Sequence, residues 1–222
     1  MALKQHPDHP NLTIISHPLL DAGLTVLRMR DTGSADYASQ MRRISSMIVF
    51  SVLEDLPTKK VPIETGTGES MSAPVLAEPK IALISVLGAG QGFVDGLRNN
   101  LLPNAREGYI AARRDEKTLR PVLSYHRLSD SLHGVLTLIL DPMLATGGSA
   151  SAAIQIMKED TNANNMRLIT LLAAPEGVKR MREDHPDIRV FTVALDNCLN
   201  EKGYILPGLG DAGDRFLGIE PI

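Results

Sequence analysis

The chain has 222 residues, of which 43% are hydrophobic and 22% are charged; this excludes a disordered, collagen-like or coiled-coil protein and predicts one domain. Lys and Arg number 23 against 26 Asp and Glu, and a net charge of −3 without long charged blocks argues against a nucleic-acid or membrane-surface binder. A single cysteine, Cys198, and the absence of an apolar run near the roughly 20 residues of a membrane span predict a reducing, cytoplasmic setting.

The N-terminal third predicts an arm, a helix and a second arm. Residues 1–16 predict an extended segment that docks through the apolar run at 12–15. Ser34 is a good N-cap, and apolar residues recur after it at helical spacing until Pro57 ends the helix. These residues are Tyr37, Met41, Ile44, Ile48 and Val52. Segment 57–79 holds four prolines and two glycines, which predicts an extended β-arm.

The remainder alternates short apolar runs with helical stretches, which predicts a parallel sheet covered on both faces. The predicted helices lie at 149–159 and from Pro175, and the predicted strands are 81–87, 106–112, 135–140, 166–174 and 188–195. Ligands of such sheets bind at the carboxyl ends of the strands. We therefore expect the site in the loops at 88–92, 141–148 and 196–216.

The loop after the third strand carries the strongest signal, LILDPMLATGGSA at 138–150. Backbone N–H groups at a helix start, with glycines that allow close approach, form an anion-binding nest. Thr146 and Ser149 add hydroxyl donors, and Asp141 at the strand end can accept hydrogen bonds from ribose hydroxyls. No Lys follows the glycines, so this is not a Walker A loop. The pattern predicts a site for a phosphorylated ribose.

DPMLATGGS and the C-terminal run YILPGLGDAGDRFLG, 204–218, resemble the 5-phosphoribosyl diphosphate (PRPP) signature and the uracil-binding segment of the uracil phosphoribosyltransferases. Shorter matches extend this resemblance over residues 17–218. It implies one α/β domain, 1–222: a Rossmann-like type I phosphoribosyltransferase core with a parallel sheet at 81–195 and a C-terminal base-binding hood at 196–222. The implied reaction makes UMP and diphosphate from uracil and PRPP, with Mg²⁺ held through PRPP and no direct protein ligand to the metal.

The same resemblance assigns residues to the two substrates. Asp141, Arg114 and Asp211 are expected to be catalytic. PRPP is expected to contact Gly88, Ala89, Gly90, Arg114, Asp141, Pro142, Met143, Leu144, Ala145, Thr146, Gly147, Gly148, Ser149 and Asp211. Uracil is expected to contact Ile205, Gly210, Asp211 and Ala212. The glycine-rich segment also favours base recognition on its own chemistry, because few side chains would separate its backbone donors and acceptors from a planar ligand.

One loop departs from the family pattern. Members have Leu-Arg-Ala-Gly after the first core strand, whereas this chain has Leu-Gly-Ala-Gly, with Gly88 in place of the diphosphate-binding Arg. Either the loop lacks a cation and the enzyme is slow, or Arg113, beside Arg114, compensates. Residues 115–130 resemble the family's flexible arm that covers the site.

Two alternatives remain open from the sequence: a phosphoribosyltransferase for another base, and a regulatory homologue that binds PRPP or a nucleotide with weak or no catalysis. The six histidines show no spacing suited to a structural zinc site. The resemblance further implies a homodimer or homotetramer and a GTP effector, whereas no nucleic-acid or membrane partner is expected.

Overall fold

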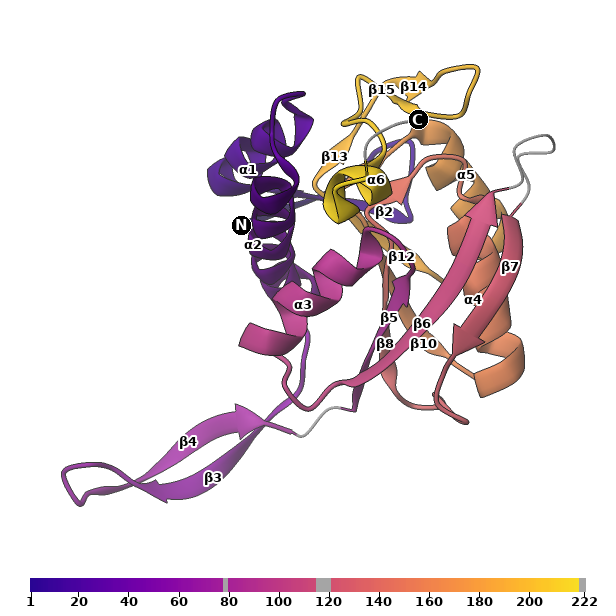
Figure 1. The fold of residues 1–222 in the computed structure, drawn as a ribbon. Helices are drawn as coiled ribbons and strands as arrows, with labels where there is room; N and C mark the ends of the chain where they lie inside the picture. The colour runs from indigo at the N-terminus through magenta and orange to yellow at the C-terminus, as the bar shows by residue number, and fades with distance from the viewer. Residues whose placement is uncertain (78–79, 115–120, 220–222) are drawn as a thin grey trace.

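The computed structural model describes residues 1–77, 80–114 and 121–219, with the backbone alone for 99–100, 112–114 and 121–123. At its centre is an eight-stranded sheet (Figure 1). In spatial order its strands are β1 (Ala2–Gln5), β2 (Leu12–Ser16), β12 (Arg189–Thr192), β10 (Asn165–Ile169), β8 (Leu136–Leu140), β5 (Ile81–Val86), β6 (Arg106–Arg114) and β7 (Pro121–Arg127). The strands from β2 to β6 are parallel, and β1 and β7 pair antiparallel at the two edges. The predicted parallel sheet is confirmed.

Helices cover both faces of this sheet. One face carries α1 (Pro18–Arg28), α2 (Ser34–Val52) and α3 (Gly90–Asn100), and the other carries α4 (Gly148–Thr161) and α5 (Pro175–Asp184) (Figure 1). Along β5, Leu83 packs into the apolar core on the face that carries α1, α2 and α3, whereas Ala82 and Ile84 pack into the core on the face that carries α4 and α5. Because both faces are buried, the central strands are apolar throughout instead of alternating.

The helix expected from residue 34 is confirmed, and all five apolar residues of its predicted face are buried. Its boundaries differ from the prediction: Gly33 is the N-cap, and the helix ends at Val52, before Pro57. Arg167 explains the early end, because its guanidinium donates to the Val52 carbonyl and pairs with Asp55 at 2.7 and 2.9 Å. This pairing holds the pKa of the Asp55 carboxyl below its ordinary value.

Helix α1 was not predicted from the sequence. Pro18 occupies its first turn, where proline is tolerated, and the Nδ1 of His17 accepts a hydrogen bond from the Leu19 N–H at 3.2 Å. Leu20, Leu24 and Leu27 lie on its buried face.

The expected docking of the N-terminal arm through residues 12–15 is confirmed, because β2 pairs parallel with β12 and is largely buried. One expectation, at the opposite edge of the sheet, needs correction. Residues 121–127, expected within a flexible arm over the site, form β7 instead, because pairing with β6 satisfies their backbone groups in the sheet. The remainder of that expected arm, 115–120, lies outside the described residues.

Three neighbouring strands break near their carboxyl ends and continue as a second, parallel sheet of β9 (Met143–Leu144), β11 (Leu172–Ala173) and β13 (Ala194–Leu195). The runs 166–174 and 188–195 are therefore two strands each, not one. Buried threonine hydroxyls occupy two of the breaks. Thr170 Oγ1 lies 2.8 Å from the carbonyl oxygens of both Pro142 and Leu172, and the Thr192 hydroxyl lies near two further carbonyls.

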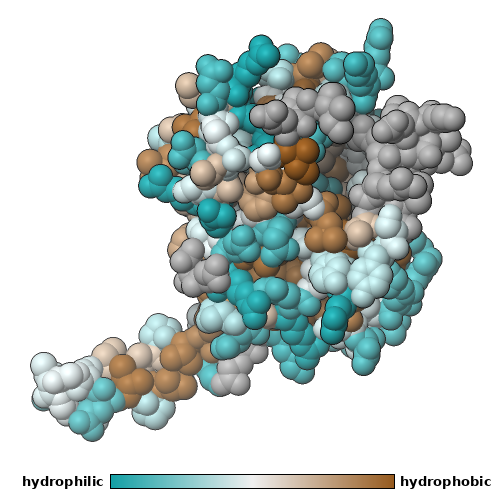
Figure 2. Space-filling model, viewed as in Figure 1, coloured by the Kyte–Doolittle hydropathy of each residue, from teal (hydrophilic) through white to brown (hydrophobic). Residues whose placement is uncertain are grey.

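The expected β-arm is confirmed as the hairpin of β3 (Thr58–Glu64) and β4 (Ser70–Leu76), while 78–79 lie outside the described residues. The hairpin projects from the body and carries exposed apolar side chains (Figures 1 and 2). These are Ile63, Met71, Val75 and Leu76. Within the described ranges, no helix combines the length and the apolar character needed to cross a bilayer.

His185, at the end of α5, is 3% exposed and packs against α4. Its Nε2 lies 3.0 Å from the Ser151 carbonyl oxygen, and the Ser151 hydroxyl donates to Asp184 at 2.7 Å. Because a carbonyl can only accept, Nε2 carries the hydrogen, and Nδ1 is buried without a hydrogen-bond partner among the described residues. Burial lowers the pKa of His185, since the charged form would place an unpartnered donor in the core.

We expect the free energy of unfolding to fall as the pH drops below about 6.5, the ordinary histidine pKa. The pKa of His185 is lower in the folded chain than in the unfolded chain, so the unfolded chain binds the proton first as the pH falls. The stability that neutral His185 contributes is therefore complete above the pKa of the unfolded chain, and it is lost as the pH falls toward the lower pKa of the folded chain. Urea denaturation at several pH values should show a flatter dependence for His185→Gln. The exposed His133→Gln is the control, and equal slopes in wild type and His185→Gln would contradict the assignment.

Candidate active site

The three loops predicted to hold the site meet at one cavity of about 970 Å³. The lining residues are 86–90 after β5, 141–143, 145 and 149 after β8, and 201–205 and 210–213 from the C-terminal segment. Each loop follows the carboxyl end of a strand, so the sheet brings together segments more than 100 residues apart in sequence. This is the position in which open parallel sheets bind ligands.

A smaller hollow of about 160 Å³ lies at the start of α4 and shares Asp141, Ala145 and Ser149 with the large cavity. Every residue from Met143 to Ala150 lines it. Gly147 is the N-cap of α4 at φ +74°, a conformation that favours glycine, and the Gly148 N–H points to the Thr146 hydroxyl at 3.4 Å. The loop predicted to form the nest therefore lines a hollow at a helix start, the place where backbone N–H groups can bind an anion.

Helix α5 supports this loop from behind through Gly177. A Cβ at Gly177 would lie 2.4 Å from the Ala145 carbonyl oxygen and 2.7 Å from that of Leu144. The Ala174 N–H bonds the same Leu144 carbonyl at 2.9 Å. Because backbone rests directly on backbone, the nest can shift little unless α5 shifts with it.

Asp141 lies directly after β8, half-buried, where both hollows meet. Its backbone N–H bonds the Ile169 carbonyl at 3.2 Å, and its carboxylate accepts from the Met143 N–H at 3.4 Å. The neighbouring strand and the following turn thus fix the side chain at the rim that the two hollows share.

The first loop also reaches the cavity, with Gly88, Ala89 and Gly90 in its lining. Gly88 has φ +105°, so any side chain there would be strained, although a Cβ would meet no described atom within 4 Å apart from its chain neighbours. Gly90 is required for packing, because a Cβ would lie 2.6 Å from the Leu140 carbonyl oxygen. This contact sets the start of α3 directly beside the residue that precedes Asp141.

The C-terminal segment closes the third side with β14 (Cys198–Leu199), β15 (Ile205–Leu206) and α6 (Ala212–Leu217) (Figure 1). Ile205, Gly210 and Ala212, the residues predicted to contact uracil, all line the cavity. Asp211 also lines it, and its carboxylate caps α6 by accepting from the N–H groups of Gly213 and Asp214 at 2.9 and 3.0 Å. One oxygen of Asp211 therefore has a structural task in the hood.

Not every predicted residue can be placed by its side chain. Arg113 and Arg114 end β6, where their backbones pair with Val122 and Pro121, and their side chains lie outside the described part of the chain. Sequence reasoning missed seven further lining residues: Val86, Leu87, Glu201, Lys202, Gly203, Tyr204 and Gly213. The available signal was position: five of them lie in the loop at 196–216 that was predicted to hold the site, and the other two end the predicted strand at 81–87.

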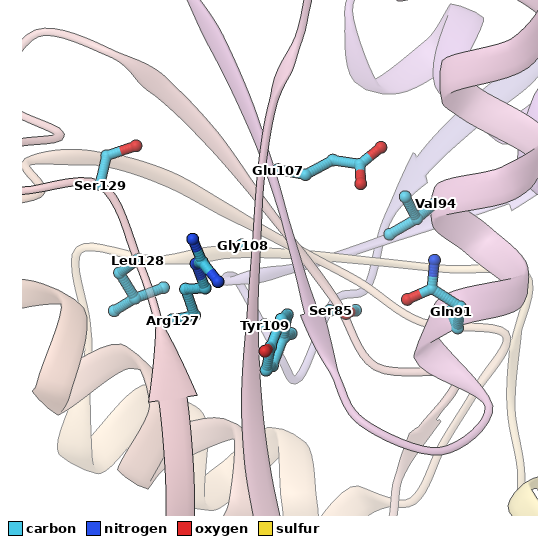
Figure 3. A pocket seen from close by; sticks show the side chains of 9 residues that line it. All are labelled: Ser85, Gln91, Val94, Glu107, Gly108, Tyr109, Arg127, Leu128 and Ser129. Atoms are coloured by element: carbon cyan, nitrogen blue, oxygen red, sulfur yellow. The ribbon is translucent and has the colours of Figure 1, made fainter.

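A second cavity, of about 450 Å³, lies beside α3 and is lined from β5, β6, α3 and the end of β7 (Figure 3). Its side chains include Ser85, Gln91, Tyr109 and Arg127. Of the residues predicted for catalysis or binding, none whose side chain the structure describes lines it, so the candidate active site is the cavity at the strand ends.

Comparison with solved structures defines the class of protein. The structure superposes on adenine phosphoribosyltransferase from Trypanosoma brucei, solved with AMP, pyrophosphate and ribose-5-phosphate, with a TM-score of 0.57 over 90% of this chain and 92% of that one, at 12% identity. Together with the parallel sheet and the loop after β8, this likeness defines the fold as that of the type I phosphoribosyltransferases. The AQ2163 protein from Aquifex aeolicus matches more closely, with a TM-score of 0.87 and 33% identity over 95% of this chain and all of that one.

Sequence comparison then gives the family. The family model described as uracil phosphoribosyltransferase matches residues 14–218. The chain is 46% identical over 208 residues to the uracil phosphoribosyltransferase of Paracoccus denitrificans, covering 94% of this chain and 97% of that one. It is 43% identical over 211 residues to that of Myxococcus xanthus, covering 95% and 99%. The chain belongs to the uracil phosphoribosyltransferase family, a family of transferases.

We expect Gly177→Ala to destabilise the fold by about 1–3 kcal/mol in urea denaturation, because the new methyl group would overpack against two carbonyl oxygens. The helix propensity of alanine works in the opposite direction by up to about 1 kcal/mol, so a net loss identifies the contact. Gly66→Ala is the control, since a Cβ there would meet no described atom within 4 Å apart from its chain neighbours. A Gly177→Ala protein as stable as wild type would show that α5 does not constrain the loop.

Proposed function

We propose that the chain transfers the 5-phosphoribosyl group from PRPP to uracil, with UMP and diphosphate as products, in pyrimidine salvage. One observation carries this proposal: the loop with the PRPP signature and the glycine-rich C-terminal segment line the same cavity, about 970 Å³ in volume. Family membership over residues 14–218 supports the choice of uracil.

The 5′-phosphate of PRPP binds in the small hollow at the start of α4. Its oxygens accept from the backbone N–H groups of the loop 145–149 and from the hydroxyls of Thr146 and Ser149, and the N-terminal end of the helix dipole favours negative charge there. The Asp141 carboxylate receives the ribose hydroxyls at the junction of the two hollows. Backbone N–H groups of the first loop, 88–90, and the Arg114 side chain meet the diphosphate.

The base lies against the C-terminal segment, a hood formed by residues from 196 onward. Uracil presents two carbonyl oxygens with an N–H between them, which backbone donors and an acceptor at Ile205, Gly210, Asp211 and Ala212 recognise. Cytosine would leave buried partners unpaired, which discriminates strongly against it.

The reaction is a displacement at ribose C1: the bond to diphosphate breaks as positive charge develops on the ribose, the bond from uracil N1 forms, and the N1 proton is released to the departing diphosphate or to water. The chain needs no covalent nucleophile for this step. It holds the two substrates in line and excludes water from the developing cation.

The carboxylates of Asp141 and Asp211 line the same cavity, and their negative charge favours a cation near them. Mg²⁺ would be held through the oxygens of PRPP, with no direct protein ligand. When bound, Mg²⁺ supplies neutralisation of the diphosphate charge. Among the described residues, no cluster of three or more His, Cys, Asp or Glu side chains could hold a metal ion.

The proposal extends to the oligomeric state, an effector and the cellular location. The apolar side chains exposed on the β3–β4 hairpin support a homodimer or homotetramer, which sedimentation would measure. Family resemblance supports a GTP effector, for which activity with added GTP is the test. The lone cysteine supports a cytoplasmic location.

UMP formation from uracil, PRPP and Mg²⁺, run beside cytosine and purine bases, tests the function. We expect activity with uracil, and we expect Asp141→Asn to lower it at least about tenfold, because the amide keeps the size of the carboxylate but removes the charge that orders the ribose. Transfer to another base instead of uracil would show that the proposed substrate is wrong. PRPP binding without UMP formation would favour a regulatory homologue, and a fully active Asp141→Asn would move its role to another carboxylate.

A second prediction concerns the phosphate nest. Thr146→Ala combined with Ser149→Ala should weaken PRPP binding, with each charge-assisted hydrogen bond worth roughly 1.5–3 kcal/mol, and should leave the affinity for free uracil nearly unchanged. Calorimetric titration with each substrate separates the two effects. An unchanged PRPP affinity would remove these hydroxyls from the site.

A further inference from the structure

Two arginines from distant parts of the chain hold the segment proposed to read the base. Arg28 ends α1 and Arg215 lies in α6, and both donate to carbonyl oxygens between residues 207 and 210. Neither arginine lines the cavity. Neither was predicted from the sequence as a functional residue, so their contacts require a separate explanation.

Arg28 makes a two-bonded ion pair with Asp196, the residue that follows β13. Its two terminal nitrogens donate to the two carboxylate oxygens at 2.6 and 2.8 Å. The Asp196 side chain is only 6% exposed, against 26% for Arg28. An ion pair of this geometry has a defined orientation and is partly shielded from water.

The same pair satisfies both backbone groups of one residue in the base segment. The Gly208 N–H donates to the Asp196 carboxylate at 2.9 Å, and the Gly208 carbonyl accepts from Arg28 at 2.7 Å. Gly208 has φ +63°, and a Cβ there would lie 2.1 Å from the Ile205 carbonyl oxygen. The ion pair therefore fixes a tight turn that lies directly against Ile205, one of the proposed uracil contacts.

Arg215 fixes the next residue along the segment. Its guanidinium donates to the Leu209 carbonyl at 2.7 Å and to the carbonyls of Leu27 and Met29 on either side of Arg28. It also lies over the Tyr37 ring, 4.6 Å from the ring centre. The end of α1 is thus joined to Gly208 by Arg28 and to Leu209 by Arg215, immediately before the proposed uracil contact Gly210.

We propose that Arg28, Asp196 and Arg215 are positioning residues for base recognition: they hold the backbone of 205–210 in the conformation that reads uracil, without touching either substrate. This inference rests on the proposed function of the cavity. A main-chain recognition surface has no side-chain rotamers to adjust, so its accuracy depends on whatever holds the turn. Loss of the anchor should therefore affect uracil and leave the separate PRPP loop at 141–149 in place.

A purely structural role makes a different prediction, and the chain offers a matched control. Arg167 and Asp55 form the same two-bonded arrangement at 2.9 and 2.7 Å, and Arg167 likewise donates to a backbone carbonyl, that of Val52. Neither residue of this pair lines the cavity. If ion pairs of this kind only stabilise the fold, Asp55→Asn and Asp196→Asn should have the same kinetic consequences.

The experiment measures kcat and the KM values for uracil and PRPP in wild type, Asp196→Asn, Arg28→Lys and Asp55→Asn. We expect Asp196→Asn to raise the uracil KM at least about tenfold while the PRPP KM stays within about twofold. Arg28→Lys keeps the charge but loses the planar fork, so it should fall between wild type and Asp196→Asn. Asp55→Asn should leave both KM values within about twofold of wild type.

Arg28→Lys serves as the test variant if Asp196→Asn does not fold, and amide hydrogen exchange provides an independent readout. Exchange at 208–210 in the free protein should be faster in Arg28→Lys than in wild type and unchanged in Asp55→Asn. The positioning role alone would be overturned if the wild type is active and Asp196→Asn and Arg28→Lys keep its uracil KM. The same conclusion would follow if these variants change the KM values for uracil and PRPP in parallel. A wild type that makes no UMP would overturn the proposed function, and this inference with it.

Discussion

The break in three neighbouring parallel strands determines where two of the three segments that line the candidate site lie. β8, β10 and β12 each stop and resume as the short ladder of β9, β11 and β13, which displaces the chain before it leaves the sheet. The Thr170 hydroxyl bonds the Pro142 carbonyl at the break, so the displacement leaves few buried polar groups unsatisfied. Asp141 precedes the first of the short strands and Asp196 follows the last. The ladder thus places the loop at 141–149 and the Arg28–Asp196 ion pair on one support.

The parts of the site that the sequence predicts are those coded by neighbouring residues. The loop at 141–149 is recognisable because an apolar strand, an acidic residue, two glycines and an apolar helix follow one another within about 20 residues. The glycine-rich segment at 203–218 is recognisable for the same reason. In both, the backbone conformation depends mainly on which residues lack a Cβ, a property that is readable letter by letter.

The parts that were missed depend on partners far away in the chain. Arg28 and Asp196 are 168 residues apart, and no local pattern marks either as a member of a pair. The strand break at Thr170 depends on a hydroxyl that bonds a carbonyl 28 residues earlier, so 166–174 read as one continuous strand. β7 was missed because its described side chains, Ser124 to Arg127, are all exposed and so lack the alternation of buried and exposed residues that marks a half-buried strand.

The hood presents main chain to the large cavity at several of its lining positions, among them Gly203, Gly210 and Gly213. As the proposed base-recognition surface, it would resist gradual evolutionary change of substrate, because replacing a side chain does not alter the order of backbone donors and acceptors. A new base preference would require insertion, deletion or reshaping of the turn itself. Duplicated copies of this gene would therefore be expected to diverge first in the elements that hold the turn, and relatives with a different preference should differ there in loop length.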